Sequence, residues 1–341
     1  MLGEQLEKRP LPEGVRTARW RDNLREPRET TDWRGLRDRI AEIIGDERPA
    51  VVLAGPIQSV TFLATLARAR PLVAVSWGSD LLVDADADTR SRFMTRYALD
   101  RSDAVFGDCR AVREAVGRHS CVVKDRIVTF PWGIDLRRFS PGESAFHLRK
   151  ELGWGQKEIF ISTRSWEPVY AIDVLLRAFA GVIRKRPGAR LVLLGDGSQE
   201  PMIRALLRDL ALEPYVHAPG RMAYQLLPEY FRLADVYVSS ALSDGTSISL
   251  LEAMACGLPV VVSGSFGNLE WVEEGVNGAL AKPGDVDSLM TAMLSLPDRP
   301  EDRAKMRASN VAVARGRADW DANFPALVRL VETVAHGQRN G

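Results

Sequence analysis

Short apolar runs alternate with longer amphipathic stretches along almost the whole chain. Runs of this kind, bounded by polar or Gly/Pro positions, are typical of buried strands. Amphipathic segments such as 173–187 and 226–234 lie between them, and 319–337 is predicted to form one amphipathic helix. Strands that alternate with helices favour parallel sheets covered on both faces, so the predicted class is α/β. The predicted strands are 50–55, 71–77, 103–108, 125–133, 158–163, 189–197, 235–240 and 258–264.

A polar segment at 140–158, which contains Gly and Pro and no strand pattern, divides the chain into two α/β units of similar size. The length of 341 residues also favours two domains. We therefore expect domains at 1–145 and 146–318, followed by a helix and tail at 319–341. Ligands of such sheets bind at the carboxyl ends of the strands, which places the expected site in a cleft between the domains.

The composition is that of a globular protein and excludes no enzyme class. The chain is 45% apolar and 27% charged with a formal net charge of +1, which gives no indication of nucleic-acid binding. Residues 1–150 hold 26 Lys and Arg against 22 Asp and Glu, an excess of +4. A solvated face explains this excess, and peripheral contact with an anionic membrane is the alternative.

The cysteines and the apolar runs indicate the cellular compartment. Three cysteines without a CxxC pair argue against a disulfide framework or a zinc site and fit a reducing compartment. The first residues lack the apolar core of a signal peptide, and no apolar run approaches the length of a membrane span. We expect a cytoplasmic protein, with the inner face of the membrane as a further possibility.

The segment 239–264 (SSALSDGTSISLLEAMACGLPVVVSG) is the most informative, because it reads as strand, loop, short helix, turn and strand. Gly245 permits a close backbone approach, and Thr246, Ser247 and Ser249 are candidate N-caps. A helix N-terminus after such a loop suits a diphosphate. Asp244 before the helix and Glu252 within it could face the same ligand. The alternative is structural: Ser249-x-x-Glu252 also fits a capping box, and Asp244 also fits an ordinary loop carboxylate.

This segment resembles the donor-binding motif of glycosyltransferase family 4, whose members are retaining enzymes of the GT-B fold. The motif has two acidic residues separated by seven others, and Asp244 and Glu252 occupy those positions. The segment 267–293 (GNLEWVEEGVNGALAKPGDVDSLMTAM) resembles the family's next conserved stretch, and the resemblance runs from about Pro49 to about Trp320. It implies two Rossmann-like domains facing across a cleft, with the C-terminal helix crossing back to the N-terminal domain.

The resemblance also implies the roles of three catalytic residues. Glu252 would hydrogen-bond the donor ribose, and Asp244 would hold a hydroxyl of the transferred sugar. Arg164, in STRSWEPVY, would clamp phosphate after the first strand of the second domain. For Arg164 the alternative is an exposed arginine at a strand end.

Further donor-binding positions follow from the same resemblance. In the second half the loop residues Gly245 and Thr246 precede Ser247 and Ile248, whose backbone N–H groups would meet the diphosphate. Gly220 and Arg221 would support the base, while Gly195 and Gly197 fit either turn glycines or ligand contacts.

In the first half, SWGSDLL (76–82) resembles a family segment in which Gly78 and Ser79 approach the donor and Asp80 braces the loop. Trp77 stands where many members have histidine, with a packing aromatic as the alternative.

Two positions depart from the family pattern. Tyr170 occupies the place of a phosphate-clamping lysine, so one positive charge is missing, although Tyr170 can still donate a hydrogen bond to the donor. The start of the chain is polar with no strand pattern before Ala50, so either the first βα unit is shortened or the chain start is misplaced. Acceptor binding is the function most affected by this difference.

The predicted function is a retaining transfer of a sugar from a nucleotide-diphosphate sugar, UDP- or GDP-linked, to a glycan, a lipid-linked sugar or a small metabolite. No metal and no cofactor is expected, because the DADAD run at 84–88 reads as a solvated loop. Alternatives are a non-catalytic nucleotide-sugar-binding subunit of a glycosyltransferase complex and a nucleotide-sugar epimerase. A dinucleotide enzyme is disfavoured because no GxGxxG follows a strand.

Overall fold

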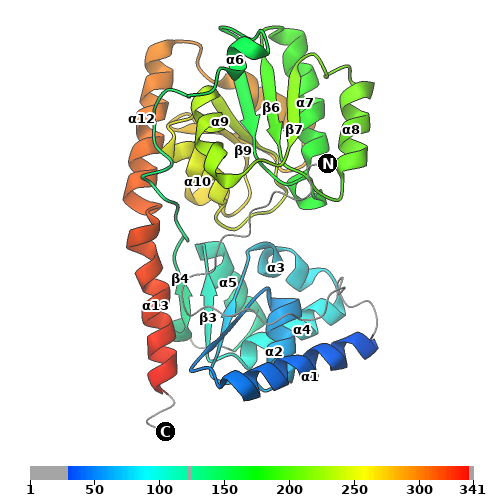
Figure 1. The fold of residues 1–341 in the computed structure, drawn as a ribbon, viewed down its shortest axis with the longest axis vertical. Helices are drawn as coiled ribbons and strands as arrows, with labels where there is room; N and C mark the ends of the chain where they lie inside the picture. The colour runs from blue at the N-terminus through cyan, green and yellow to red at the C-terminus, as the bar shows by residue number, and fades with distance from the viewer. Residues whose placement is uncertain (1–29, 122–123, 338–341) are drawn as a thin grey trace. The chain divides into compact units, whose positions relative to one another are not determined.

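The computed structural model describes residues 30–121 and 124–337, and contacts between Cα atoms divide them into two compact units (Figure 1). Of the described residues, the first unit takes 30–107, 114–121, 124–128 and 328–337, and the second takes 108–113 and 129–327. The short segment 108–113 thus groups with the second unit, although it follows a strand of the first. The domain limits expected at 145 and 318 stay predictions.

The first unit contains a four-stranded sheet in the order β1-β2-β3-β4. The β1/β2 and β2/β3 pairs are parallel, with Val52 opposite Leu72 and Ala74 opposite Val105. The strands are β1 (Val52–Ala54), β2 (Leu72–Val75), β3 (Ala104–Gly107) and β4 (Ile127–Thr129). The helices are α1 (Thr30–Glu47), α2 (Phe62–Leu66), α3 (Ser79–Leu82), α4 (Thr89–Asp100) and α5 (Arg110–His119), with short turns η1 (Ile57–Thr61), η2 (Asp84–Asp86) and η3 (Lys124–Arg126).

The second unit contains a six-stranded parallel sheet in the order β10-β9-β8-β5-β6-β7. Its strands are β5 (Ile159–Ser162), β6 (Arg190–Leu194), β7 (Val216–Gly220), β8 (Val236–Ser239), β9 (Val260–Ser263) and β10 (Gly278–Ala281). Its helices are α6 (Leu148–Glu151), α7 (Ile172–Lys185), α8 (Glu200–Asp209), α9 (Leu227–Leu233), α10 (Ile248–Ala255), α11 (Val286–Ser295) and α12 (Pro300–Arg317), with short turns η4 (Pro168–Tyr170), η5 (Tyr224–Leu226) and η6 (Asn268–Glu270). The last helix, α13 (Trp320–Gly337), begins in the second unit and ends in the first.

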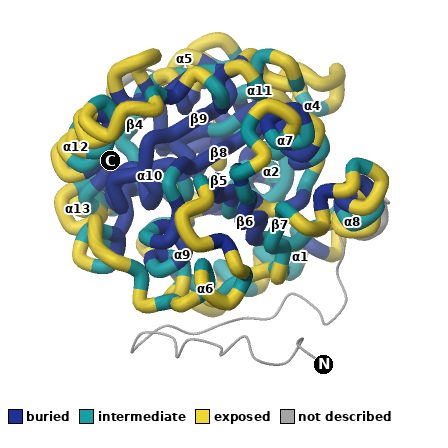
Figure 2. The backbone as a smooth tube through the Cα atoms, turned by 90° about the horizontal axis from the view of Figure 1, so that it is seen from above, coloured by how far each residue is buried: buried dark blue, intermediate teal, exposed yellow. Residues whose placement is uncertain are grey.

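Both faces of the second sheet are buried, as Figure 2 shows for β5, β8 and β9. Alternate strand residues point to opposite faces. Ile161 and Tyr237 pack with α9 and α10 in one apolar cluster, whereas Phe160 and Val238 pack with α7, α8 and α11 in the other. This two-sided burial explains the nearly continuous apolar runs of the strands, which are typical of parallel sheets.

The predicted α/β class and its two Rossmann-like units are confirmed. All eight predicted strands form, and the segment predicted as one C-terminal helix is α13, which contains Pro325. Two edge strands were not predicted from sequence, β7 and β10. β7 contains Pro219 and is only partly buried, and β10 reads Gly-Ala-Leu-Ala, so neither has the β-branched composition that marks a strand.

The expectation about the chain start concerns residues that lie mostly outside the described ranges. Within them, α1 occupies Thr30–Glu47 and β1, the first described strand, begins at Val52.

Candidate functional site

The candidate site lies where the chain order of the second sheet reverses. From β5 the chain proceeds through β6 and β7 to one edge, and then returns to β8 on the other side of β5. Arg164 follows β5 and Asp244 follows β8, which are neighbouring strands. Open α/β sheets bind ligands at such a switch point, outside the carboxyl ends of the strands.

Arg164 is the centre of the site. Its Nη1 donates to Ser247 Oγ at 2.7 Å and to Ser249 Oγ at 3.0 Å, and its Nη2 lies 2.8 Å from Asp244 Oδ2. The side chain is buried, so the alternative of an exposed strand-end arginine is wrong. Burial disfavours the charged guanidinium, but Asp244, Tyr237 and Tyr170 together outweigh it, and the pKa of Arg164 is raised.

Tyr170, at the position where the family has a lysine, packs on this arginine. The guanidinium carbon of Arg164 lies 4.1 Å from the centre of the Tyr170 ring, which is a cation–π arrangement. The backbone carbonyls of Tyr170 and Ala171 both accept from Ser240 Oγ at 2.9 Å, which ties this turn to the end of β8. Tyr170 therefore gives Arg164 an aromatic support.

Ser247 is the N-cap of α10. It has an extended backbone, and its Oγ accepts from Leu250 N at 3.4 Å. The proposed capping box of Ser249 and Glu252 is therefore wrong, because Ser249 lies inside the helix, where its Oγ meets Tyr237 OH at 2.8 Å. Ile248, the first helical residue, is 37% exposed. The N–H groups of a first helical turn have no intrahelical acceptor, so this end of α10 suits an anion.

Two carboxyls accompany the Arg164 cation. Burial raises the pKa of Asp244, against the opposing charge of Arg164. Burial also raises the pKa of Glu252 to about 8, with a hydrogen bond from Tyr224 and the charge of Arg164 opposing it. Glu252 lies on α10 and is buried, whereas Asp244 is half-buried. The structure thus brings the three predicted catalytic residues into one unit and couples their charges.

Gly245 and Thr246 form the loop before α10. Thr246 N donates to Asp108 Oδ2 at 3.0 Å, and Thr246 Oγ1 donates to the Asp108 carbonyl at 2.7 Å. A Cβ on Gly245 would lie 2.5 Å from Asp108 Oδ1, so only glycine fits there. Asp108 was not predicted as a site residue. The one available signal was a carboxylate at the end of a predicted strand.

Other glycines also allow close backbone approach. Gly195, which follows β6, has φ +116°, and a Cβ there would lie 2.4 Å from the Arg164 carbonyl oxygen. Gly197 has φ +158° and a Cβ there would lie 2.6 Å from the Trp166 carbonyl oxygen. Their contacts support the interpretation as turn glycines that let the β6 and β5 loops pack together.

Gly78, Ser79 and Asp80 belong to the first unit, where they form a self-contained loop after β2. Asp80 is buried, and its carboxylate accepts from Ile57 N at 3.0 Å, Ser76 Oγ at 2.7 Å, Trp77 N at 3.1 Å and Leu81 N at 3.0 Å. Burial raises its pKa against these hydrogen bonds. Asp80 therefore braces the loop, and Gly78 has φ +93°, a backbone that favours glycine. Trp77 is 65% exposed, which argues against the alternative of a packing aromatic.

Arg221 directly follows β7 and is exposed, beside Gly220 with φ +95°. It lies at the carboxyl end of the same sheet, two strands from β5. Its predicted contact with the base stays a prediction.

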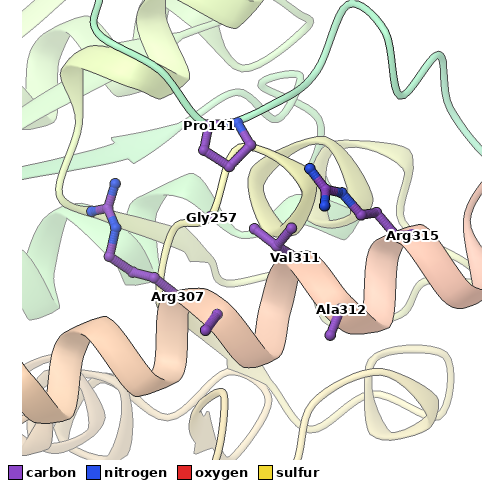
Figure 3. Close-up of a pocket in the computed structure, with 7 residues that line it drawn as sticks. Pro141, Gly257, Arg307, Val311, Ala312 and Arg315 are labelled. Carbon is purple, nitrogen blue, oxygen red and sulfur yellow. The ribbon is translucent and has the colours of Figure 1, made fainter.

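The described residues outside the candidate site contain a cavity but no metal-binding cluster. Within 30–121 and 124–337, no group of three or more His, Cys, Asp or Glu could hold a metal ion. A cavity of about 380 Å³ lies against α12 and is lined by Pro141, Gly257, Val311 and two arginines, Arg307 and Arg315 (Figure 3). It contains none of the residues of the candidate site. No helix of the described chain is both long and apolar enough to cross a membrane.

Two family models match the chain. The model described as glycosyl transferases group 1 matches residues 145–311, and a glycosyl transferase 4-like model matches residues 3–108. The first match contains Arg164, Asp244 and Glu252, and the second contains the loop at Gly78. The second match also reaches well before Ala50, where the sequence pattern showed no strand.

Curated relatives agree with the models. A GDP-mannose-dependent alpha-(1-6)-phosphatidylinositol monomannoside mannosyltransferase of Mycolicibacterium smegmatis is 25% identical over 96% of this chain and 87% of its own length. A GDP-mannose-dependent monoacylated alpha-(1-6)-phosphatidylinositol monomannoside mannosyltransferase of Corynebacterium glutamicum is 31% identical over 60% of this chain. A D-inositol 3-phosphate glycosyltransferase of Saccharomonospora viridis is 34% identical, also over 60%. The chain spans 55% and 50% of the length of these last two relatives.

Solved structures share the fold. Anabaena HepE in complex with UDP-glucose superposes with a TM-score of 0.74 at 21% identity, covering 90% of this chain and 82% of that one. Sucrose-phosphate synthase of Thermosynechococcus elongatus gives a TM-score of 0.75 at 18% identity over 92% and 79%. The fold is therefore GT-B. Together with the family models and the curated relatives, it makes the chain a glycosyltransferase, and the alternatives of an epimerase and a non-catalytic subunit lose their support.

Proposed function

We propose that this glycosyltransferase is a retaining, metal-independent enzyme that transfers mannose from GDP-mannose to a hydroxyl of an inositol-containing phospholipid or its mannoside. The observation that carries the proposal is the arrangement of Arg164, Asp244 and Ser247 at the N-terminus of α10. This arrangement combines a buried cation with a helix end, and both suit a diphosphate.

The names of the relatives support the donor and the acceptor class. Two of them are GDP-mannose-dependent enzymes acting on phosphatidylinositol mannosides, and another acts on D-inositol 3-phosphate. Their common feature is an inositol ring, either on a lipid or as a free phosphate. The first matches nearly the whole chain, so its donor and its lipid acceptor are the first substrates to test.

In the proposed mechanism, Arg164 and the first turn of α10 stabilise the charge that develops on the departing diphosphate. The glycosidic bond to the β-phosphate breaks while the acceptor oxygen attacks from the same face of the sugar, and its proton passes to the leaving phosphate. Asp244 orients Arg164 and faces a hydroxyl of the sugar, and Glu252 accepts from or donates to the ribose.

We also propose a cytoplasmic location at a membrane surface. The three cysteines are free, and a lipid acceptor requires contact with a bilayer. The excess of basic residues in the first 150 positions supports attraction to anionic lipid.

The test is a transfer assay with radiolabelled GDP-mannose and vesicles containing phosphatidylinositol, with inositol phosphate as a parallel acceptor and EDTA present throughout. We expect labelled lipid that is cleaved by an α-mannosidase. Transfer only to inositol phosphate would overturn the lipid acceptor, and a β-linked product would overturn retention. Absence of both binding and transfer with GDP-mannose, UDP-glucose and related donors would overturn the proposed donor site.

A further inference from the structure

Asp108 and Arg164 both hold the loop before α10, at different residues. Arg164 binds the loop at its two ends, through Asp244 and Ser247. Asp108 binds its middle, because Thr246 donates both its N–H and its hydroxyl to this residue. The loop 244–247 is therefore fixed by one cation and one carboxylate that do not contact each other directly in any described hydrogen bond or ion pair.

The Asp108 carboxyl is poorly compensated. It is buried, with 6% of the residue exposed, and its Oδ1 has no hydrogen-bond partner among the described residues. It lies against Gly245, where a Cβ would come within 2.5 Å of Oδ1 and 2.7 Å of Oδ2. A buried carboxylate with only one of its oxygens satisfied carries a desolvation cost.

The charged and titratable groups around Asp108 do not offset its charge. Asp244 on the facing loop is a second carboxyl, and the adjacent Cys109 thiol is neutral, because burial raises its pKa to about 12. On α5, Arg110 pairs with Glu270, with 3.3 Å between Nε and Oε2. Burial, together with the charge of Asp244, raises the pKa of Asp108 to about 7, against the hydrogen bonds from Thr246 N and the Cys109 side chain.

We propose that Asp108 is a positioning residue for the diphosphate of the donor: it orients Thr246 and the N-terminus of α10, and it favours diphosphate binding when its carboxyl is neutral. The identity of the ligand rests on the proposed function. The contact by which Asp108 fixes the loop is independent of that function. Binding of a diphosphate beside Asp108 and Asp244 brings negative charges together, so uptake of a proton by Asp108 relieves the repulsion.

The test compares Asp108→Asn and Asp108→Ala with the wild-type protein in calorimetric titrations with GDP at pH 6 and pH 8. Asparagine keeps an acceptor for Thr246 N and removes the charge. At pH 8 we expect Asp108→Asn to bind GDP about tenfold more tightly than wild type, because pH 8 lies about one unit above the pKa of Asp108. At pH 6 the two proteins should bind GDP about equally. Asp108→Ala should bind more weakly than wild type at both pH values. Asp285→Asn is the matched control, since Asp285 caps α11 by accepting from Ser288 N at 2.8 Å and should leave GDP binding unchanged.

A second readout does not depend on the ligand. Because the folded-state pKa of Asp108 is raised from 3.8 to about 7, the folded protein binds more protons in that window and loses stability as pH rises through it. Urea unfolding from pH 5 to pH 8 should therefore show a smaller loss of stability for Asp108→Asn than for wild type. Equal losses would overturn the inference, and so would equal GDP affinities of the two proteins at pH 8. Failure of the wild-type protein to bind any nucleotide, with the stability difference present, would instead count against the proposed function.

Discussion

The carboxylate of Asp244 lies 2.8 Å from the guanidinium of Arg164, although the two residues are eighty positions apart and follow different strands. Arg164 is buried and Asp244 is half-buried, and each compensates the charge of the other. The pair couples the stability of the second unit to the arrangement that we propose for the donor. Removing one partner therefore has consequences for both.

Arg164→Gln should lower kcat/KM by at least about 100-fold, because it removes charge-assisted contacts worth about 1.5–3 kcal/mol each. It should also lower the free energy of unfolding by up to about 3 kcal/mol, because the half-buried Asp244 loses its cation. The double variant Arg164→Gln/Asp244→Asn should recover most of the stability and none of the activity. Transfer assays and urea unfolding measure both effects.

Arg186→Gln provides the control for that series. Arg186 pairs with Glu158 at 3.2 Å, at the opposite end of β5 from Arg164. This variant should retain transfer. If Arg164→Gln were as active as Arg186→Gln, the central role of Arg164 would be refuted.

Glu252→Gln should change how stability depends on pH. The pKa of Glu252 is raised from 4.5 to about 8, so the folded protein binds more protons than the unfolded chain between these values. Stability therefore falls as pH rises through that window and levels off above it. At pH 8.5 we expect Glu252→Gln to be more stable than wild type by about 1 kcal/mol or more, and at pH 4 to be about equal to it. Denaturant midpoints at the two pH values measure this difference. If the stabilities of the two proteins changed with pH in parallel, the expected burial of the charge would be contradicted.

Gly267→Ala should distort the donor loop. A Cβ at this position would lie 1.8 Å from the Gly245 carbonyl oxygen, which is backbone and has no room to yield. We expect a loss of about 1–3 kcal/mol of stability, typical of overpacking, and a weaker affinity for GDP.

Gly316→Ala is the comparison for Gly267→Ala, since Gly316 lies within α12 with nothing within 4 Å of its would-be Cβ. It should raise stability by about 0.5–1 kcal/mol, as expected for glycine replaced within a helix. Unchanged GDP affinity in Gly267→Ala would show that the loop yields without effect on the site.

Tyr170 variants separate aromatic support from charge. Tyr170→Phe keeps the ring over Arg164 and should retain GDP affinity within about twofold, whereas Tyr170→Ala loses a cation–π contact worth about 0.5–2 kcal/mol and should weaken it. Tyr170→Lys should tighten GDP binding if a lysine there reaches the phosphates. Calorimetric titration ranks the three, and equal affinities would show that position 170 does not act on the diphosphate.

The sequence by itself determined the α/β class, eight of the strands and the N-terminal region of α10. These follow from local features: apolar runs long enough to be buried on both faces, and a Gly-containing loop followed by Ser and a short apolar helix. β7 and β10 were not predicted because edge strands need fewer β-branched residues and tolerate proline, such as Pro219 in β7. The same motif also identified Asp244 and Glu252 as candidates, although it could not exclude a capping box at Ser249.

Only the tertiary structure decided which side chains share a charge environment. The pairing of Arg164 with Asp244, the stacking of Tyr170 on that arginine and the hold of Asp108 on Thr246 join positions from 6 to 138 residues apart. Strand order brings such positions together, and strand order is set by the packing of the whole sheet. Burial, which raises the pKa of Glu252 to about 8 and that of Asp108 to about 7, arises in the same way, because it depends on every element packed around the carboxyl and not on its neighbours in sequence.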